Sequence, residues 1–239
     1  MSYVIEILAS FFAVVVVLTL HEFSHAFIAY QCGDPTPKFA KRLSVNPLRH
    51  FDPVGLICFT LVGFGWAKPV PINPNNFKHY KRGLALTSVA GVVMNYITAF
   101  LALPLFLVVF NYCPEIPFLS SFLYYLTYFM FAYSLSFCVF NLLPLYPLDG
   151  FNLLSALAKP WNRVVRFLKK YGYYILLALI AESFVCNALV RAGIPQADYA
   201  NVLGWIMKFA TNIFGYPIVA LWNLLPWRVK IYWRIIPWL

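Results

Sequence analysis

The chain has 239 residues, of which 62% are hydrophobic, 19% aromatic and only 11% charged. A soluble core of this size does not need so much apolar surface, and the mean hydropathy of +0.73 is typical of a polytopic membrane protein. The formal net charge of +10 does not indicate a nucleic-acid partner, because Lys and Arg lie in short connections between apolar runs. There they set membrane topology and contact anionic lipid. We therefore expect a lipid bilayer around the chain and no nucleic acid.

The first apolar run, residues 4–30, contains the pattern His21-Glu22-Phe23-Ser24-His25. On a helix, His21 and His25 stand one turn apart on one face, so both imidazoles can point at one ion. Glu22 lies on the adjoining flank, within reach of a water beside that ion. This H-E-x-x-H arrangement is typical of zinc hydrolases. The alternative is a chance match with two core histidines, but ionisable groups at membrane depth are costly and favour a functional site.

Five spanning segments are predicted at the usual length of about 20 residues. They cover residues 4–30, 84–110, 119–143 with a broken continuation to about 158, 172–191, and 203–225. Lys and Arg are frequent in the connections 32–83 and 159–171 and absent from 111–118. This alternation predicts an N-terminus outside, a C-terminus in the cytoplasm, and a metal site nearer the cytoplasmic face.

The connection between the first two spans is unusual for a loop. Its middle, Pro53 to Trp66, is almost wholly apolar but too short and too rich in glycine to span as a helix. The stretch Lys68 to Pro74 contains three prolines, which force an extended backbone. We expect a short β-strand or re-entrant segment beside the metal site, since extended backbone at membrane depth must be buried or line a cavity. The alternative is an amphipathic loop on the membrane surface.

A catalytic zinc site needs a third protein ligand and an open position. The candidates are Asp149, His50, His79, Asp52 and Glu182. Asp149 is favoured, because it follows an apolar span that Pro144 and Pro147 break open. A lone carboxylate there is expensive unless it meets a cation, and the two histidines predict one. For His50 and Asp52, a role in fixing the loop is the stronger alternative.

With these motifs the chain resembles the site-2 protease family of intramembrane zinc metalloproteases, in its short bacterial or archaeal form. The resemblance starts from H-E-x-x-H in the first span and N-x-x-P-x-x-P-L-D-G at Asn141 to Gly150. Further matches are Arg42 to Pro47 (RLSVNP), His50 to Gly55 (HFDPVG), Gly65 to Pro71 (GWAKPVP) and Gly91 to Asn95 (GVVMN). These matches follow the family order over residues 20–150, whereas residues 160–239 resemble nothing that adds to this assignment.

The resemblance implies one Zn²⁺ per chain, held by His21, His25 and Asp149, with Glu22 as the general base. Asn141 and Asn95 are candidate donors to the oxyanion; the alternative for each is a helix–helix hydrogen bond. The expected activity is hydrolysis of peptide bonds in single-span membrane proteins, for regulated intramembrane proteolysis or clearance of membrane remnants. A substrate must unwind to be cut, and the extended stretch Pro69, Val70, Pro71, Ile72 and Asn73 is the candidate edge strand that pairs with it.

We therefore expect an all-α polytopic membrane protein in which residues 1–239 form a single metalloprotease domain. Its catalytic core covers about residues 1–158, two further helices cover 172–191 and 203–225, and residues 227–239 form an interfacial tail. No PDZ or nucleotide-binding regulatory module is expected, and the location is the plasma membrane of a prokaryote. Two rival interpretations are a transporter of zinc or protons and a catalytically inactive scaffold. The sequence names neither the substrate nor the oligomeric state.

Overall fold

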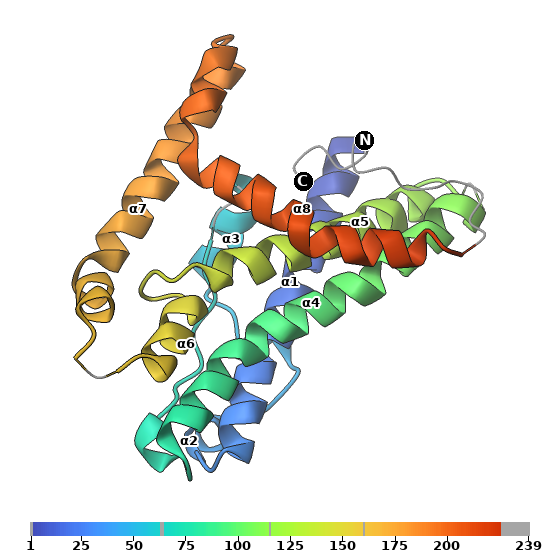
Figure 1. The fold of residues 1–239 in the computed structure, drawn as a ribbon. Helices are drawn as coiled ribbons and strands as arrows, with labels where there is room; N and C mark the ends of the chain where they lie inside the picture. The colour runs from blue at the N-terminus through green and yellow to red at the C-terminus, as the bar shows by residue number, and fades with distance from the viewer. Residues whose placement is uncertain (1, 63–64, 115, 160, 226–239) are drawn as a thin grey trace.

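The computed structural model describes residues 2–62, 65–114, 116–159 and 161–225 (Figure 1). Over these ranges the chain is helical, with no strand and one isolated antiparallel bridge between Phe51 and Ala67. The α-helices are α1 (Ser2–Gln31), α2 (Thr36–Phe39), α3 (Pro53–Val62), α4 (Tyr80–Tyr112), α5 (Leu119–Leu142), α6 (Asp149–Leu157), α7 (Arg163–Arg191) and α8 (Val202–Trp222). Short 3₁₀ turns cover Pro47–Arg49, Pro74–Asn76 and Pro195–Ala200. The predicted all-α class is confirmed for these ranges.

Five helices in the described ranges are long and apolar enough to cross a membrane: α1, α4, α5, α7 and α8. They correspond to the five predicted spans, and they make the chain an integral membrane protein. The largest difference is at α7, which begins at Arg163 and not near residue 172. The side chain of Asn162 accepts hydrogen bonds from the N–H groups of Val164 and Val165. This cap starts the helix within the basic connection, before its apolar part.

Three helices, α1, α4 and α5, pack closely and form the core (Figure 1). Small side chains let the helices approach, because lipid provides no hydrophobic drive for association and close packing must hold them. Ala9 and Ala13 of α1 meet Phe129 of α5, and Ala99 and Ala102 of α4 lie in a second buried cluster. That cluster also contains Leu103, Phe106, Leu107, Phe131, Leu135, Ile218 and Val219.

The third span is broken where the sequence predicts it. α5 ends at Leu142, the residues through Leu148 contain Pro144 and Pro147, and α6 begins at Asp149. The chain turns back sharply here, so that Gly150 lies directly against the backbone of Leu142 and Leu143. A Cβ added at Gly150 would overlap their backbone atoms. The break therefore places Asp149 at the first turn of a new helix beside the core.

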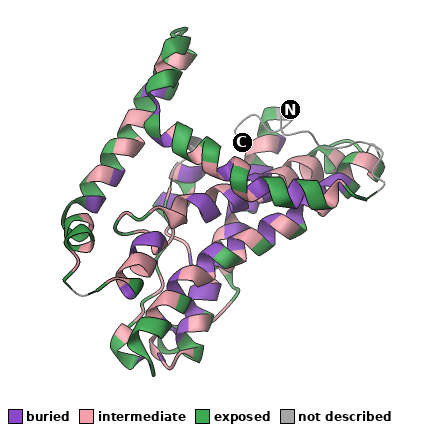
Figure 2. Ribbon diagram, viewed as in Figure 1, coloured by how far each residue is buried: buried purple, intermediate pink, exposed green. Residues whose placement is uncertain are grey.

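The last two long helices contact the core only in part. α8 crosses α4 and α5, and the indole N–H of Trp222 donates to the carbonyl of Phe100 at 2.9 Å. α7 extends away from the core, and Figure 2 shows that most of its length is exposed or half-buried. An apolar helix with so much exposed surface is suited to lipid contact.

The connection between α1 and α4 contains a short helix and, in the described ranges, no β-strand; whether this helix is the expected re-entrant segment stays a prediction. α3 covers Pro53–Val62, and the ring of Phe59 packs against Tyr133 and Phe137 of α5 at 5.1 and 5.5 Å between centroids. The stretch Pro69–Asn73 is neither helix nor strand in the described ranges, and Asn73 at its end has an extended backbone. Three prolines among residues 69–74 explain this, because proline lacks the N–H that a ladder requires. The predicted tail, residues 227–239, lies outside the described residues.

Candidate metal centre

The two histidines of H-E-x-x-H lie on the face of α1 that the core covers. His21 and His25 are 5% and 7% exposed. Their rings are 4.6 Å apart between centroids, and their Nε2 atoms are 3.1 Å apart. The helical spacing therefore brings two imidazole nitrogens to one point, as the motif predicts.

Helix α4 presses against this point and fixes both rings. A Cβ added at Gly91 would overlap the side chains of His21 and His25, so only glycine allows this approach. One turn before Gly91, the carbonyl of Thr87 lies 2.7 Å from Nδ1 of His25. One turn after it, the side-chain nitrogen Nδ2 of the fully buried Asn95 lies 3.0 Å from Nδ1 of His21. A carbonyl can only accept, so His25 carries its proton on Nδ1 and, when neutral, presents a lone pair at Nε2.

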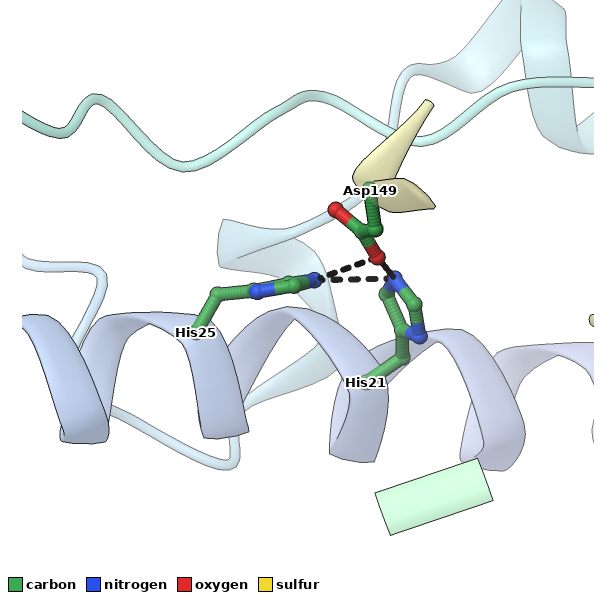
Figure 3. A group of neighbouring side chains, drawn as sticks. All are labelled: His21, His25 and Asp149. Carbon is green, nitrogen blue, oxygen red and sulfur yellow. Dashed lines mark hydrogen bonds and ion pairs between the residues drawn. The ribbon is translucent and has the colours of Figure 1, made fainter. Parts of the chain in front are cut away.

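Asp149 completes the group from α6. Its Oδ2 atom lies 3.2 Å from Nε2 of His25 and 3.5 Å from Nε2 of His21 (Figure 3). In Figure 3 the carboxylate and both Nε2 atoms face one another, while Nδ1 of His21 points away. Among groups of three or more His, Cys, Asp or Glu side chains in the described ranges, this is the one whose atoms converge as metal ligands do.

The geometry of this group fits a zinc ion. Two atoms that each lie about 2.0–2.2 Å from one zinc in tetrahedral geometry are about 3.3–3.6 Å apart. The three distances between His21, His25 and Asp149 are 3.1, 3.2 and 3.5 Å. Oδ2 of Asp149 is also buried without a hydrogen-bond donor among the described residues. A buried carboxylate oxygen facing imidazole lone pairs is costly unless a cation lies between them.

Glu22 lies beside the group on α1. Its Oε2 atom accepts a hydrogen bond from the backbone N–H of Val70 at 3.2 Å. Val70 belongs to the extended stretch Pro69, Val70, Pro71, Ile72 and Asn73 that the sequence marks as a candidate substrate strand. The structure therefore brings this stretch to the predicted general base, although its pairing with a substrate stays a prediction.

The two candidate oxyanion donors have different surroundings. Asn95 lies at Nδ1 of His21, on the far side of the ring from Asp149. Asn141 is half-buried near the end of α5, and its amide donates to the carbonyl of Phe137 at 3.1 Å. The second bond is the local alternative that asparagine often takes in membrane helices. For both residues the oxyanion role stays a prediction.

The other candidate ligands have separate places. His50 is fully buried, with Nε2 at 2.6 Å from the carbonyl of Ser44, and Asp52 accepts the N–H of Gly55 at the start of α3. His79 is exposed before α4, and Glu182 accepts the N–H of Val202 at 3.0 Å. His50 and Asp52 thus have the loop-fixing bonds that the sequence suggested.

Sequence reasoning missed Asp34 as a buried contact of this region. Asp34 is 0% exposed and accepts hydrogen bonds from Thr36, Asn73 and Asn76. The signal was the run Asp34-Pro35-Thr36 directly after α1, since aspartate before proline and threonine favours a side-chain-capped turn. Its long-range partners at 73 and 76 are not visible in any local pattern.

The fold and this group together describe a helical membrane protein with a His–His–Asp cluster whose atoms could hold a metal ion. Residues 115–181 match Peptidase family M50. The chain is also 37% identical over 186 residues to a protein of Bacillus subtilis (strain 168) named putative zinc metalloprotease YwhC. The aligned region covers 75% of this chain and 84% of that protein. No solved structure matches the chain.

The chain therefore belongs to peptidase family M50, the site-2 protease family. The predicted enzyme class, a zinc metallopeptidase of the site-2 protease type, is thereby confirmed. The family match, residues 115–181, includes Asp149 and its proline-broken segment but not the H-E-x-x-H pattern at residues 21–25.

Proposed function

We propose that this chain is an intramembrane zinc metalloprotease that cuts single-span membrane proteins within or next to their spanning segments. The observation that carries the proposal is the triangle of His21, His25 and Asp149, which converges inside a bundle of apolar helices. The side chain of Glu22 follows His21 directly on the same helix. A hydrolytic site at this depth fits substrates that are themselves embedded in lipid.

His21, His25 and Asp149 would hold one zinc ion per chain. Zinc bound there supplies a Lewis acid that activates a water and polarises the scissile carbonyl. The carbonyl of Thr87 holds the His25 proton on Nδ1 and so directs the other nitrogen into the site. A half-turn of the Asn95 amide would bring Oδ1 to Nδ1 of His21, where it would accept the Nδ1 proton and direct Nε2 into the site in the same way. This turn would also give a partner to Oδ1, which is buried without one among the described residues.

Glu22 moves the proton in this proposal. Its carboxylate takes a proton from the attacking water and delivers it to the leaving amine, which leaves Glu22 unchanged after each turnover. The Val70 N–H restricts one carboxylate oxygen and leaves the other for this transfer. Asn141 remains the candidate donor to the oxyanion, because Asn95 is engaged at the far side of His21.

The orientation follows from charge. Lys and Arg in the 32–83 and 159–171 connections place both connections in the cytoplasm, with the N-terminus outside. His21 lies about 28 Å along α1 at helical rise, so the metal centre lies nearer the cytoplasmic face. A bacterial relative supports a prokaryotic plasma membrane as the location. In this orientation α3 dips into the membrane from the cytoplasm, which its packing on Tyr133 and Phe137 supports.

The substitution Glu22→Gln tests the activity. Glutamine keeps the shape of the side chain and cannot act as a base, so cleavage of a membrane-embedded peptide should fall by about 10²–10⁴. Zinc content should stay near one per chain, because Glu22 is not a ligand. The matched control is Glu182→Gln in α7, which should retain cleavage. A metal-loaded Glu22→Gln protein that cuts at the parental rate would falsify the proposal.

A further inference from the structure

The segment Lys68–Asn76, called the proline segment below, is fixed at its first residue by two buried groups. The N–H of Lys68 donates to the carbonyl of His50 at 2.9 Å. The carbonyl of Lys68 accepts a hydrogen bond from Nη1 of Arg42 at 3.1 Å, and the same Nη1 donates to the carbonyl of Arg49. Arg42 is 6% exposed, and its guanidinium donates these hydrogen bonds to backbone carbonyls inside the protein. Such bonds fix the position of the chain.

Asp34 fixes the other end. Its Oδ2 accepts the N–H of Asn73 at 2.7 Å, and its Oδ1 accepts from the side chains of Asn76 and Thr36 at 2.7 and 2.5 Å. Burial alone would raise the pKa of Asp34, but these hydrogen bonds outweigh it and hold the pKa below its usual value. The N–H of Asp34 donates to the carbonyl of Ala29, which ties this anchor to the helix that carries Glu22.

Between the two anchors, one backbone donor faces the candidate site. Pro69 and Pro71 have no N–H, so Val70 supplies the single donor of that triplet. This N–H points at Oε2 of Glu22 at 3.2 Å. Glutamate has three rotatable side-chain bonds, and a donor on a backbone held at both ends restricts them better than a mobile side chain does.

We propose that Asp34 and Arg42 are positioning residues, which hold the proline segment so that the Val70 N–H orients the Glu22 carboxylate for proton transfer. This inference rests on the proposed function, in which Glu22 is the general base. A small displacement of a catalytic group is known to reduce rates by up to about a hundredfold. Loss of this hydrogen bond should therefore lower kcat while zinc binding and substrate affinity persist.

A pair of substitutions at one position isolates the donor. Val70→Pro removes the N–H and keeps an extended backbone between two prolines, whereas Val70→Ala removes most of the side chain and keeps the N–H. Relative to Val70→Ala, Val70→Pro should lower kcat by about tenfold to a hundredfold with KM within about twofold and zinc content unchanged. Equal kcat values for the two variants, or a loss that falls on KM alone, would overturn the proposal in favour of a substrate-pairing or purely structural role.

Amide exchange tests the anchors without any assay of cleavage. In Asp34→Ala the Val70 amide should exchange at least about tenfold faster, because Asn73 and Asn76 lose their acceptor. The matched control is Asp52→Ala, which removes an aspartate that caps α3 in the same connection and should leave Val70 protected. Arg42→Lys, which keeps the charge but replaces the planar guanidinium with a compact and more strongly hydrated ammonium, should expose Val70 to a smaller extent. Unchanged Val70 exchange in a folded Asp34→Ala protein would overturn the anchor role.

The two proposals fail in different ways. If Glu22→Gln cuts at the parental rate, the proposed function fails, whatever the exchange rate at Val70. If Glu22→Gln is inactive but Val70→Pro and Val70→Ala share one kcat, the protease assignment stands and the positioning inference fails.

Discussion

The core helices α1, α4 and α5 and the hairpin of α7 and α8 satisfy their polar groups in different ways. In the hairpin, Glu182 has Oε1 bonded to the N–H of Val202 and the thiol of Cys186, which ties the carboxylate to the start of α8. Beside the core, Asp149 at the start of α6 places Oδ2 against Nε2 of His21 and His25 of α1. Glu182 also has a buried oxygen without a partner in the described residues, but no ligand set gathers around it there. A buried carboxylate therefore indicates a metal only where other ligand atoms converge on it.

The core and the hairpin also differ in how closely their residues pack. Gly91 brings α4 so close to α1 that even one methyl group would overlap two histidine rings. Most of α7 is exposed or half-buried (Figure 2). The small residue Ala181 of this helix is exposed. Close packing in the core fixes the positions of the His21 and His25 rings, whereas exposed positions of the hairpin can accept larger side chains without overlap. Substitutions of the same kind should thus have large effects in the core and small effects in the hairpin.

The largest contrast is expected between the two carboxylates. Asp149→Ala removes one of three ligands, so zinc content should fall from about one per chain to below about 0.1, and cleavage should be lost with it. Glu182→Ala should keep the metal and lose at most about 1 kcal/mol of stability, since one N–H at the start of α8 loses its acceptor. Elemental analysis of purified protein measures the metal. Full zinc occupancy in Asp149→Ala would show that another residue is the third ligand.

The next contrast concerns added volume. Gly91→Ala inserts a methyl group against both rings and should weaken zinc binding by at least about tenfold, because the ligands must shift. Ala181→Val adds more volume at an exposed site of α7 and should leave zinc affinity unchanged. Competition with a chelator of known affinity compares the two. Equal affinities would mean that the histidines can move aside without loss, and that close packing at Gly91 does not set the site.

Much of the core could be predicted because its determinants are local. The length of the apolar runs sets the long helices, and the spacing of His21 and His25 sets their common face. Pro144 and Pro147 break the third span and place Asp149 at a new helix start. The role of Gly91 could not be read in the same way, since its close approach is a property of two helices and not of one.

The connection 32–83 was harder to predict for a physical reason. Its apolar middle has the composition of either a strand or a buried helix, and short apolar runs do not separate the two. α3 is a helix, and the prolines after it leave an extended segment without a ladder. Asp34 is bonded to residues about 40 positions away, so no local sequence pattern indicates that it anchors this connection.

A smaller effect is expected at Asn95, which contacts the proposed ligand His21 and is not itself a proposed ligand. Asn95→Ala removes the partner of His21 Nδ1 and should weaken zinc binding by about 10–100-fold. If Asn95 instead stabilised the oxyanion, the same change would lower kcat and leave zinc affinity unaltered, so the two readings separate on metal titration. The control in the hairpin is Asn187→Ala, which removes a partner of Asn201 and should not alter zinc affinity.

The smallest effect is a pH dependence confined to the connection that holds the proline segment. Burial lowers the pKa of His50 below the ordinary value of about 6.5 for histidine, and the nearby charges of Arg42 and Arg49 lower it further, whereas the hydrogen bond to Ser44 opposes the shift. The unfolded connection then takes up a proton at higher pH than the folded one. Its stabilisation by neutral His50 is complete above about pH 6.5 and declines as the pH falls through the lowered pKa.

Amide exchange at Lys68, which donates to the carbonyl of His50, measures this effect after correction for the intrinsic pH dependence of exchange. Protection should decrease by a few-fold between about pH 6.5 and 5, while amides in the middle of α7 stay constant. His50→Gln keeps a side-chain N–H that can reach the carbonyl of Ser44 and has no titrating group, so it should abolish the change. A pH response that persists in His50→Gln would assign the titration to another group and leave His50 with a role in packing alone.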